Sequence, residues 1–154
     1  MTAPSAGRTL RIVRRLPATP EVVFAAWTDA ESLKTWMCPG STYIATAELD
    51  VRVGGQFRIV MRNEENETVH TGVYREILPP ERLVFTWIST ATRGEVTLVT
   101  VELRPEGDAT ELILTHEGLP DADAAAQYES GWQGVVAKLE TYVHLSVPGE
   151  RGAQ

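Results

Sequence analysis

The sequence predicts an α+β fold in which a curved seven-stranded antiparallel sheet wraps around a long C-terminal helix, with two short helices after the first strand. Three observations support this prediction. Residues 42–117 hold six segments in which apolar and polar residues alternate, separated by short turns, as in an antiparallel meander. One strand-like and two short helical segments precede them, and one long amphipathic segment follows. Helices segregated from the strands in this way indicate an α+β fold.

Length and composition indicate one globular domain over residues 8–146, with flexible tails at 1–7 and 147–154. The chain has 154 residues, of which 43% are hydrophobic and 23% charged, so global disorder is excluded. Fourteen basic against 21 acidic residues give a net charge of −7, which argues against a nucleic-acid partner. The single cysteine, Cys38, excludes an intramolecular disulfide. We see neither a secretory signal nor a membrane span, so a cytoplasmic protein is expected.

The N-terminal elements follow from local signals. Residues 8–16 read as a strand. Thr19 and Pro20 then form a helix start, because threonine can cap a helix and proline suits its first turn. Asp29 can cap a second, short helix over residues 31–36.

The strands of the meander are bounded by turn residues such as Gly54-Gly55 and Thr92-Arg93-Gly94. They are expected at residues 42–49, 56–62, 68–78, 82–90, 95–104 and 110–117. Asp121 or Asp123 caps the final helix, which is expected over residues 124–145. A strongly twisted sheet of this size curls, and one helix cannot fill its concave face. The sequence therefore predicts an apolar cavity between the sheet and this helix.

Six strings of the sequence carry a resemblance to a known family: Phe24–Asp29, Leu33 with Trp36, Asp50–Phe57, Gly72–Ile77, Pro80–Trp87 and Gly131-Trp132. Together they resemble the homologues of the activator of the heat-shock protein 90 ATPase. The resemblance covers residues 8–146, and it implies the helix-grip fold of the superfamily that includes START lipid-binding domains and polyketide aromatase/cyclases. It also implies a cavity protein without naming the ligand, since fold does not determine function.

The leading interpretation is a binding module that holds an apolar or aromatic small molecule without a cofactor or metal. Aromatic rings provide apolar walls for such a ligand. Trp87 and Trp132 are expected to face each other across the cavity. An enzyme is the less favoured reading, a homodimer is left open, and a chaperone contact has no support in the sequence. The expected cavity residues are Trp36, Phe57, Met61, Tyr74, Phe85, Trp87, His116, Tyr128, Trp132 and Val136.

Two other function classes remain as alternatives. One is an aromatase/cyclase-like enzyme acting on a polyketide-like substrate, in which Tyr74, Glu76 and His116 transfer protons. It requires Tyr74 and Glu76 to share a strand face, as residues i and i+2 do. The opposing interpretation pairs Glu76 with Arg75, Arg58 or Arg82 on the solvent face and makes His116 a hydrogen-bonded core residue. The other alternative, suggested by the family name, is a chaperone-associated interaction protein.

Overall fold

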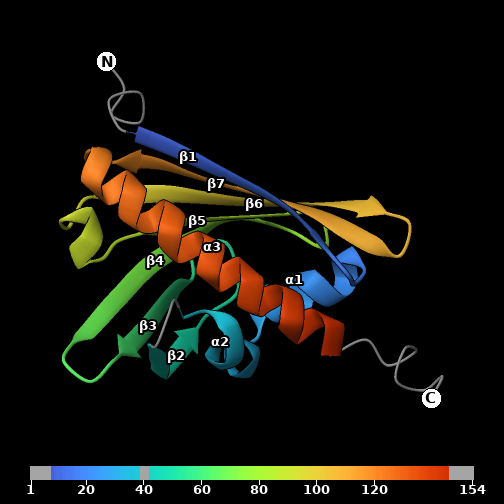
Figure 1. Ribbon diagram of the computed structural model, residues 1–154, viewed down its shortest axis with the longest axis horizontal. Helices are drawn as coiled ribbons and strands as arrows, with labels where there is room; N and C mark the ends of the chain where they lie inside the picture. Colours follow the sequence, from blue (N-terminus) through green and yellow to red (C-terminus); the bar gives the residue numbers. More distant parts are fainter. Residues whose placement is uncertain (1–7, 39–41, 146–154) are drawn as a thin grey trace.

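Seven antiparallel strands form one open, curved sheet (Figure 1). The computed structural model describes residues 8–38 and 42–145, so the expected tails lie outside the described residues. The strand order is β1-β7-β6-β5-β4-β3-β2, which confirms the meander and adds β1 beside β7. The strands are β1 (Arg8–Leu16), β2 (Tyr43–Leu49), β3 (Gln56–Arg62), β4 (Glu67–Leu78), β5 (Arg82–Trp87), β6 (Thr97–Glu106) and β7 (Ala109–Leu119).

The helices cover one face of this sheet. Helix α3 (Ala122–Leu145) crosses the face diagonally, and α1 (Pro20–Thr28) and α2 (Ala30–Trp36) pack beside it (Figure 1). The order of elements confirms the α+β class and the two short helices after the first strand. The core is the layer between the sheet and the helices, where the α3 side chains Val135, Val136, Leu139 and Val143 are all buried.

The helix starts agree largely with the capping signals. Asp29 caps α2, because its carboxylate accepts a hydrogen bond from the Ser32 backbone N–H at 3.0 Å. Asp121 caps α3 in the same way, accepting from the Ala124 N–H at 2.9 Å. Thr19 occupies the N-cap position of α1, but its side chain makes no capping hydrogen bond.

The strand expected over residues 82–90 ends earlier, at Trp87. A short 3-10 helix, η2 (Thr90–Thr92), follows it. Ser89 accepts a hydrogen bond from the Ala91 N–H at 3.1 Å, and Thr92 Oγ1 accepts from the Ser89 N–H at 3.1 Å. Side-chain bonds of this kind compete with the strand ladder and turn the chain locally, so the next strand begins only at Thr97.

A register shift in β4 separates two residues that were expected to share a face. Tyr74 pairs with Phe85, whereas Glu76 pairs with Val84, so the intervening Arg75 is an extra residue in the ladder. An extra residue reverses the alternation of side chains beyond it. Tyr74 is therefore buried in the core, and Glu76 lies on the other face in an ion pair with Arg82 at 2.8 Å. The expectation of a shared face was wrong.

Candidate functional site

A small apolar cleft, named the inner cleft here, lies between the sheet and helices α1 and α2. Its volume is about 20 Å³, which is room for about one water molecule. Drug-sized ligands occupy roughly 300–1,000 Å³, so the cleft is much smaller than the cavity that the sequence predicts. The lining residues are Trp27, Leu33, Met37, Leu49, Phe57, Ile59, Tyr74, Leu83, Phe85 and Trp87.

The aromatic side of the inner cleft depends on a glycine. Phe57 on β3 pairs directly with Gly72 on β4. A Cβ atom at position 72 would overlap with the Phe57 ring and with the Thr86 carbonyl oxygen, so only glycine allows this close approach. The Phe57 ring then meets Phe85 edge-on, with ring centroids 5.5 Å apart, and Trp87 at 5.8 Å.

The inner cleft has an uncharged lining. Tyr74 is its one ionisable side chain among the ten lining residues. Burial, helped by the nearby Asp50 carboxylate, raises the pKa of Tyr74 to about 12. The phenol is therefore a neutral hydroxyl group at physiological pH. Such a lining favours a neutral ligand, because an ion placed there would lose its hydration without gaining a partner.

The four tryptophans differ in the hydrogen bonding of their indole N–H groups. Those of Trp87 and Trp132 each donate to a side chain at 3.0 Å. Those of Trp27 and Trp36 are buried and have no acceptor among the described residues. Trp27 lines the inner cleft, and Trp36 packs edge-on against it with ring centroids 4.8 Å apart.

Beside the inner cleft, His116 is the centre of a buried hydrogen-bond chain. Its Nδ1 accepts from the Trp132 indole N–H at 3.0 Å, so the proton of the neutral ring is on Nε2. Nε2 then donates to Thr97 Oγ1 at 2.8 Å, and Thr97 donates to the Trp87 carbonyl oxygen at 2.6 Å. Burial lowers the pKa of His116 to about 3. His116 is thus a neutral core residue that links β7, β6 and α3.

The expected pair Trp87 and Trp132 does face each other, with ring centroids 5.6 Å apart. The two rings are in contact, so they fill the space between the sheet and α3. Tyr128 on α3 adds a second link, because its hydroxyl accepts from the Trp87 indole N–H and lies 2.5 Å from Ser89 Oγ. This packing explains why the inner cleft opens towards α1 and α2 rather than towards α3.

Four of the expected cavity residues line the inner cleft: Phe57, Tyr74, Phe85 and Trp87. The other six belong to the surrounding core and hydrogen-bond chain: Trp36, Met61, His116, Tyr128, Trp132 and Val136. Sequence reasoning placed Trp27 on the apolar face of a helix and assigned it to ordinary core. It also left five lining residues out of the expected cavity: Leu33, Met37, Leu49, Ile59 and Leu83. The positions of Leu33 and Met37, four residues apart, carried a usable signal, because such residues lie on one face of a helix.

The side chains of the enzymatic alternative are not brought together. Tyr74 lines the inner cleft, Glu76 is paired with Arg82 on the other face, and both ring nitrogens of His116 are hydrogen-bonded within the core. The interpretation in which Glu76 pairs with Arg82 and His116 is a core residue is confirmed.

Cys38 has a partner that is distant in sequence. Its side chain is buried, and Lys138 Nζ lies 3.7 Å from its Sγ while donating to its carbonyl oxygen at 2.7 Å. The contact ties the end of α2 to α3, and sequence spacing alone gave no indication of it.

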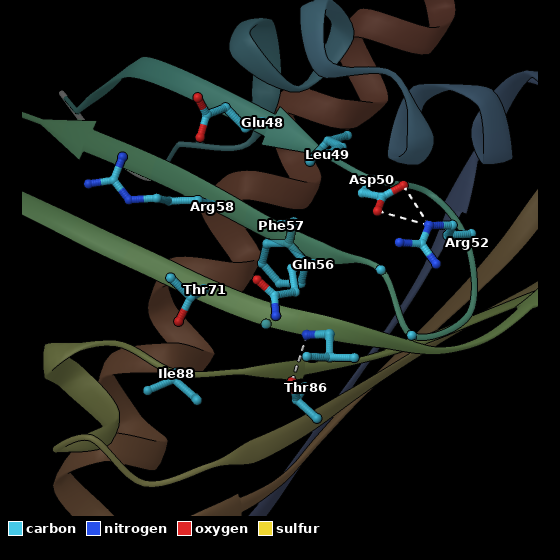
Figure 2. A pocket seen from close by; sticks show the side chains of 14 residues that line it. Glu48, Leu49, Asp50, Arg52, Gln56, Phe57, Arg58, Thr71, Thr86 and Ile88 are labelled. Carbon is cyan, nitrogen blue, oxygen red and sulfur yellow. Dashed lines mark hydrogen bonds and ion pairs between the residues drawn. The ribbon is translucent and has the colours of Figure 1, made fainter.

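A larger hollow, of about 780 Å³, lies on the opposite face of the sheet (Figure 2). Gln56 and Arg58 border it, and these residues alternate with the inward-facing Phe57 along β3. At its floor Thr86 Oγ1 accepts from the Val73 N–H at 2.8 Å. Charged side chains also line it. One of them, Arg52, donates a hydrogen bond to the Asp50 carboxylate at 2.9 Å (Figure 2). This outer groove is open and polar, unlike the inner cleft.

The described part of the chain has neither a metal-binding cluster nor a membrane-spanning helix. Within residues 8–38 and 42–145, no three His, Cys, Asp or Glu side chains are grouped so that they could hold a metal ion. In the same residues no helix is long and apolar enough to span a membrane.

Comparison with known proteins identifies the family. The sequence model described as "Activator of Hsp90 ATPase homolog 1-like protein" matches residues 17–144. The chain belongs to this family. A solved structure from Chromobacterium violaceum is 29% identical, with a TM-score of 0.79 over 87% of this chain and 96% of that one. The AHSA1 protein from Silicibacter pomeroyi is 27% identical, with a TM-score of 0.79 over 90% of this chain and 99% of that one. No curated protein matches the chain.

Proposed function

We propose that the protein binds an apolar or aromatic small molecule in the inner cleft, without a cofactor. One observation carries the proposal: half of the lining consists of aromatic side chains from three strands and a helix, namely Trp27, Phe57, Tyr74, Phe85 and Trp87, and the whole lining is uncharged. Family membership supports it, since the helix-grip fold often holds hydrophobic ligands. Relative to the expectation, the ligand lies towards α1 and α2 instead of directly under α3.

Binding requires the inner cleft to expand, because its volume of about 20 Å³ is smaller than any such ligand. Leu33 on α2, Met37 directly after this helix and Leu49 at the end of β2 form one wall. Strand β2 is an edge of the sheet, hydrogen-bonded to β3 alone. An outward shift of this wall therefore breaks fewer contacts than a shift of the central strands. Met37 also adapts readily, because its side chain is unbranched and flexible.

The test is a titration with 2-ethylnaphthalene, monitored by isothermal titration calorimetry and, separately, by tryptophan emission. We expect saturable heat and a saturable change in emission, since Trp27 and Trp87 both line the inner cleft. Leu33→Phe replaces a leucine side chain of the lining with a bulkier aromatic ring. The ring occupies space that the ligand needs, so binding should weaken at least about tenfold. Val53→Phe, at a position with 64% exposure, is the matched control and should bind as wild type does.

Two results would contradict this function. The absence of saturable binding to the wild-type protein removes it outright. Equal affinity of wild type and a folded Leu33→Phe variant places the ligand outside the inner cleft. The enzymatic alternative receives no support from the positions of Tyr74, Glu76 and His116, and nothing in the geometry favours the chaperone-associated alternative.

A further inference from the structure

We propose that the ligand of the inner cleft is an uncharged molecule with a hydrogen-bond acceptor, a carbonyl or ether oxygen, that accepts from the Trp27 indole N–H. The inference rests on the proposed function and specifies the class of ligand. Two independent features support it: an unpaired buried donor on a residue of the lining, and the electrostatics of the cleft.

The donor is the first feature. Trp27 lines the inner cleft and is 2% exposed, yet its Nε1 has no acceptor among the described residues. Buried polar groups are normally hydrogen-bonded, and an unsatisfied one is a recurrent sign of a site for water or ligand. Of the three other indoles in the core, those of Trp87 and Trp132 are satisfied by the protein, and that of Trp36, which lies outside the lining, has no acceptor among the described residues. The inner cleft has room for about one water-sized group, which is also the size of a ligand oxygen.

The charge of the ligand follows from the second feature. The lining contains no lysine, arginine or charged histidine that could pair with an anion. The Asp50 carboxylate disfavours negative charge at Tyr74, one of the lining residues. A carboxylate or phosphate ligand would lose its hydration and meet a like charge. An ammonium group has only hydrogen-bond donors, so it would leave the Trp27 N–H without an acceptor. A neutral carbonyl or ether satisfies the donor at the least desolvation cost.

The experiment compares three ligands of one size: 2-acetylnaphthalene, 2-ethylnaphthalene and 2-naphthoate. Dissociation constants are measured at neutral pH for wild type, Trp27→Phe and Trp36→Phe. Trp36 has the same unpaired indole N–H outside the cleft lining, so its variant is the matched control. The wild type should bind the acetyl compound more tightly than the ethyl compound. In Trp27→Phe this advantage should fall about tenfold, the size expected for one buried hydrogen bond. It should stay unchanged in Trp36→Phe, and 2-naphthoate should bind more weakly than 2-acetylnaphthalene throughout.

A second measurement does not require any variant to fold. In ¹H–¹⁵N spectra of the wild type, 2-acetylnaphthalene should move the Trp27 indole N–H resonance downfield, as a new hydrogen bond does, and 2-ethylnaphthalene should not. The Trp132 resonance serves as the internal reference, because its N–H group already has an acceptor and its ring lies outside the lining of the cleft.

The outcomes separate this inference from the proposed function. If none of the three compounds binds the wild type, the proposed function fails. If both neutral compounds bind but the advantage of the acetyl compound is unchanged in Trp27→Phe and the Trp27 resonance does not respond to the acetyl group, the role of Trp27 is wrong while binding stands. Tighter binding of 2-naphthoate than of either neutral compound overturns the requirement for an uncharged ligand.

Discussion

Acidification from about pH 7.5 to about pH 5 should lower the free energy of unfolding by about 4 kcal/mol through two buried histidines, His116 and His70. Both are nearly inaccessible, with 0% and 7% exposure. Burial lowers the pKa of His116 to about 3. It lowers that of His70 to about 4, against the opposing effect of a hydrogen bond to the Ile59 backbone.

The direction follows from where each histidine binds its proton. In the unfolded chain both have ordinary pKa values of about 6.5, so they take up protons as the pH falls below that value. In the native protein they stay neutral down to pH 3 to 4. Their full contribution to stability is therefore present above about pH 6.5 and is lost as the pH falls towards the native pKa values. At about 1.36 kcal/mol per pH unit, each histidine costs about 2 kcal/mol by pH 5.

His116→Gln tests this reasoning directly. The glutamine amide can still accept from Trp132 and donate to Thr97, but it does not titrate. Urea unfolding at several pH values, followed by tryptophan emission, should show the loss between about pH 7.5 and pH 5 falling from about 4 to about 2 kcal/mol.

A wild-type loss below about 1 kcal/mol over this range would refute the reasoning. So would a folded His116→Gln variant that retains the full loss. Either result would mean that the His116 ring accepts a proton in the native protein. Protonation of Nδ1 would force the Trp132 N–H to give up its hydrogen bond to that atom.

Three further substitutions can be measured by the same urea unfolding assay, and the effect of EDTA by thermal unfolding. Gly72→Ala should destabilise the protein by several kcal/mol, because the new methyl group overlaps with the Thr86 carbonyl oxygen. Gly134→Ala in α3, where a Cβ meets nothing within 4 Å, should instead stabilise it by about 1 kcal/mol. Equal effects of the two substitutions would contradict the packing described. Trp132→Ala should cost about 3–5 kcal/mol, since the ring is 3% exposed and satisfies His116 Nδ1, and a much smaller loss would mean that the ring borders an open space. Addition of EDTA should leave the melting temperature unchanged, and a drop reversed by Zn²⁺ would reveal an overlooked metal site.

Local patterns were sufficient to predict most of the fold. Alternating residues located the strands to within a few positions, and Asp29 and Asp121 marked helix starts that they do cap. These signals act over a few residues, so one sequence is enough to read them. The β4 shift at Arg75 was missed, because no local signal distinguishes an extra residue from a regular strand residue.

The candidate site was harder to predict, because it depends on how distant elements pack. Trp132 was correctly placed opposite Trp87, but whether two rings touch or enclose a space is decided by side-chain volumes across the whole layer. The same limit applies to Trp27. Its position on the apolar face of a helix indicated burial, and only the structure shows that its N–H lacks an acceptor among the described residues.

The position of β1 has a consequence for the order in which the sheet can form. Strands β2 to β7 each pair with a neighbour in sequence, but β1 pairs with β7, so that Leu16 meets Thr110. Contacts between such distant residues form late, because a long loop must close before they gain anything. During synthesis from the N-terminus, β1 therefore waits without its partner until β7 has been made. Strand β1 has four arginines, at positions 8, 11, 14 and 15. Charged side chains of this kind keep an unpaired strand from pairing with other chains, so they protect β1 from aggregation until β7 is available.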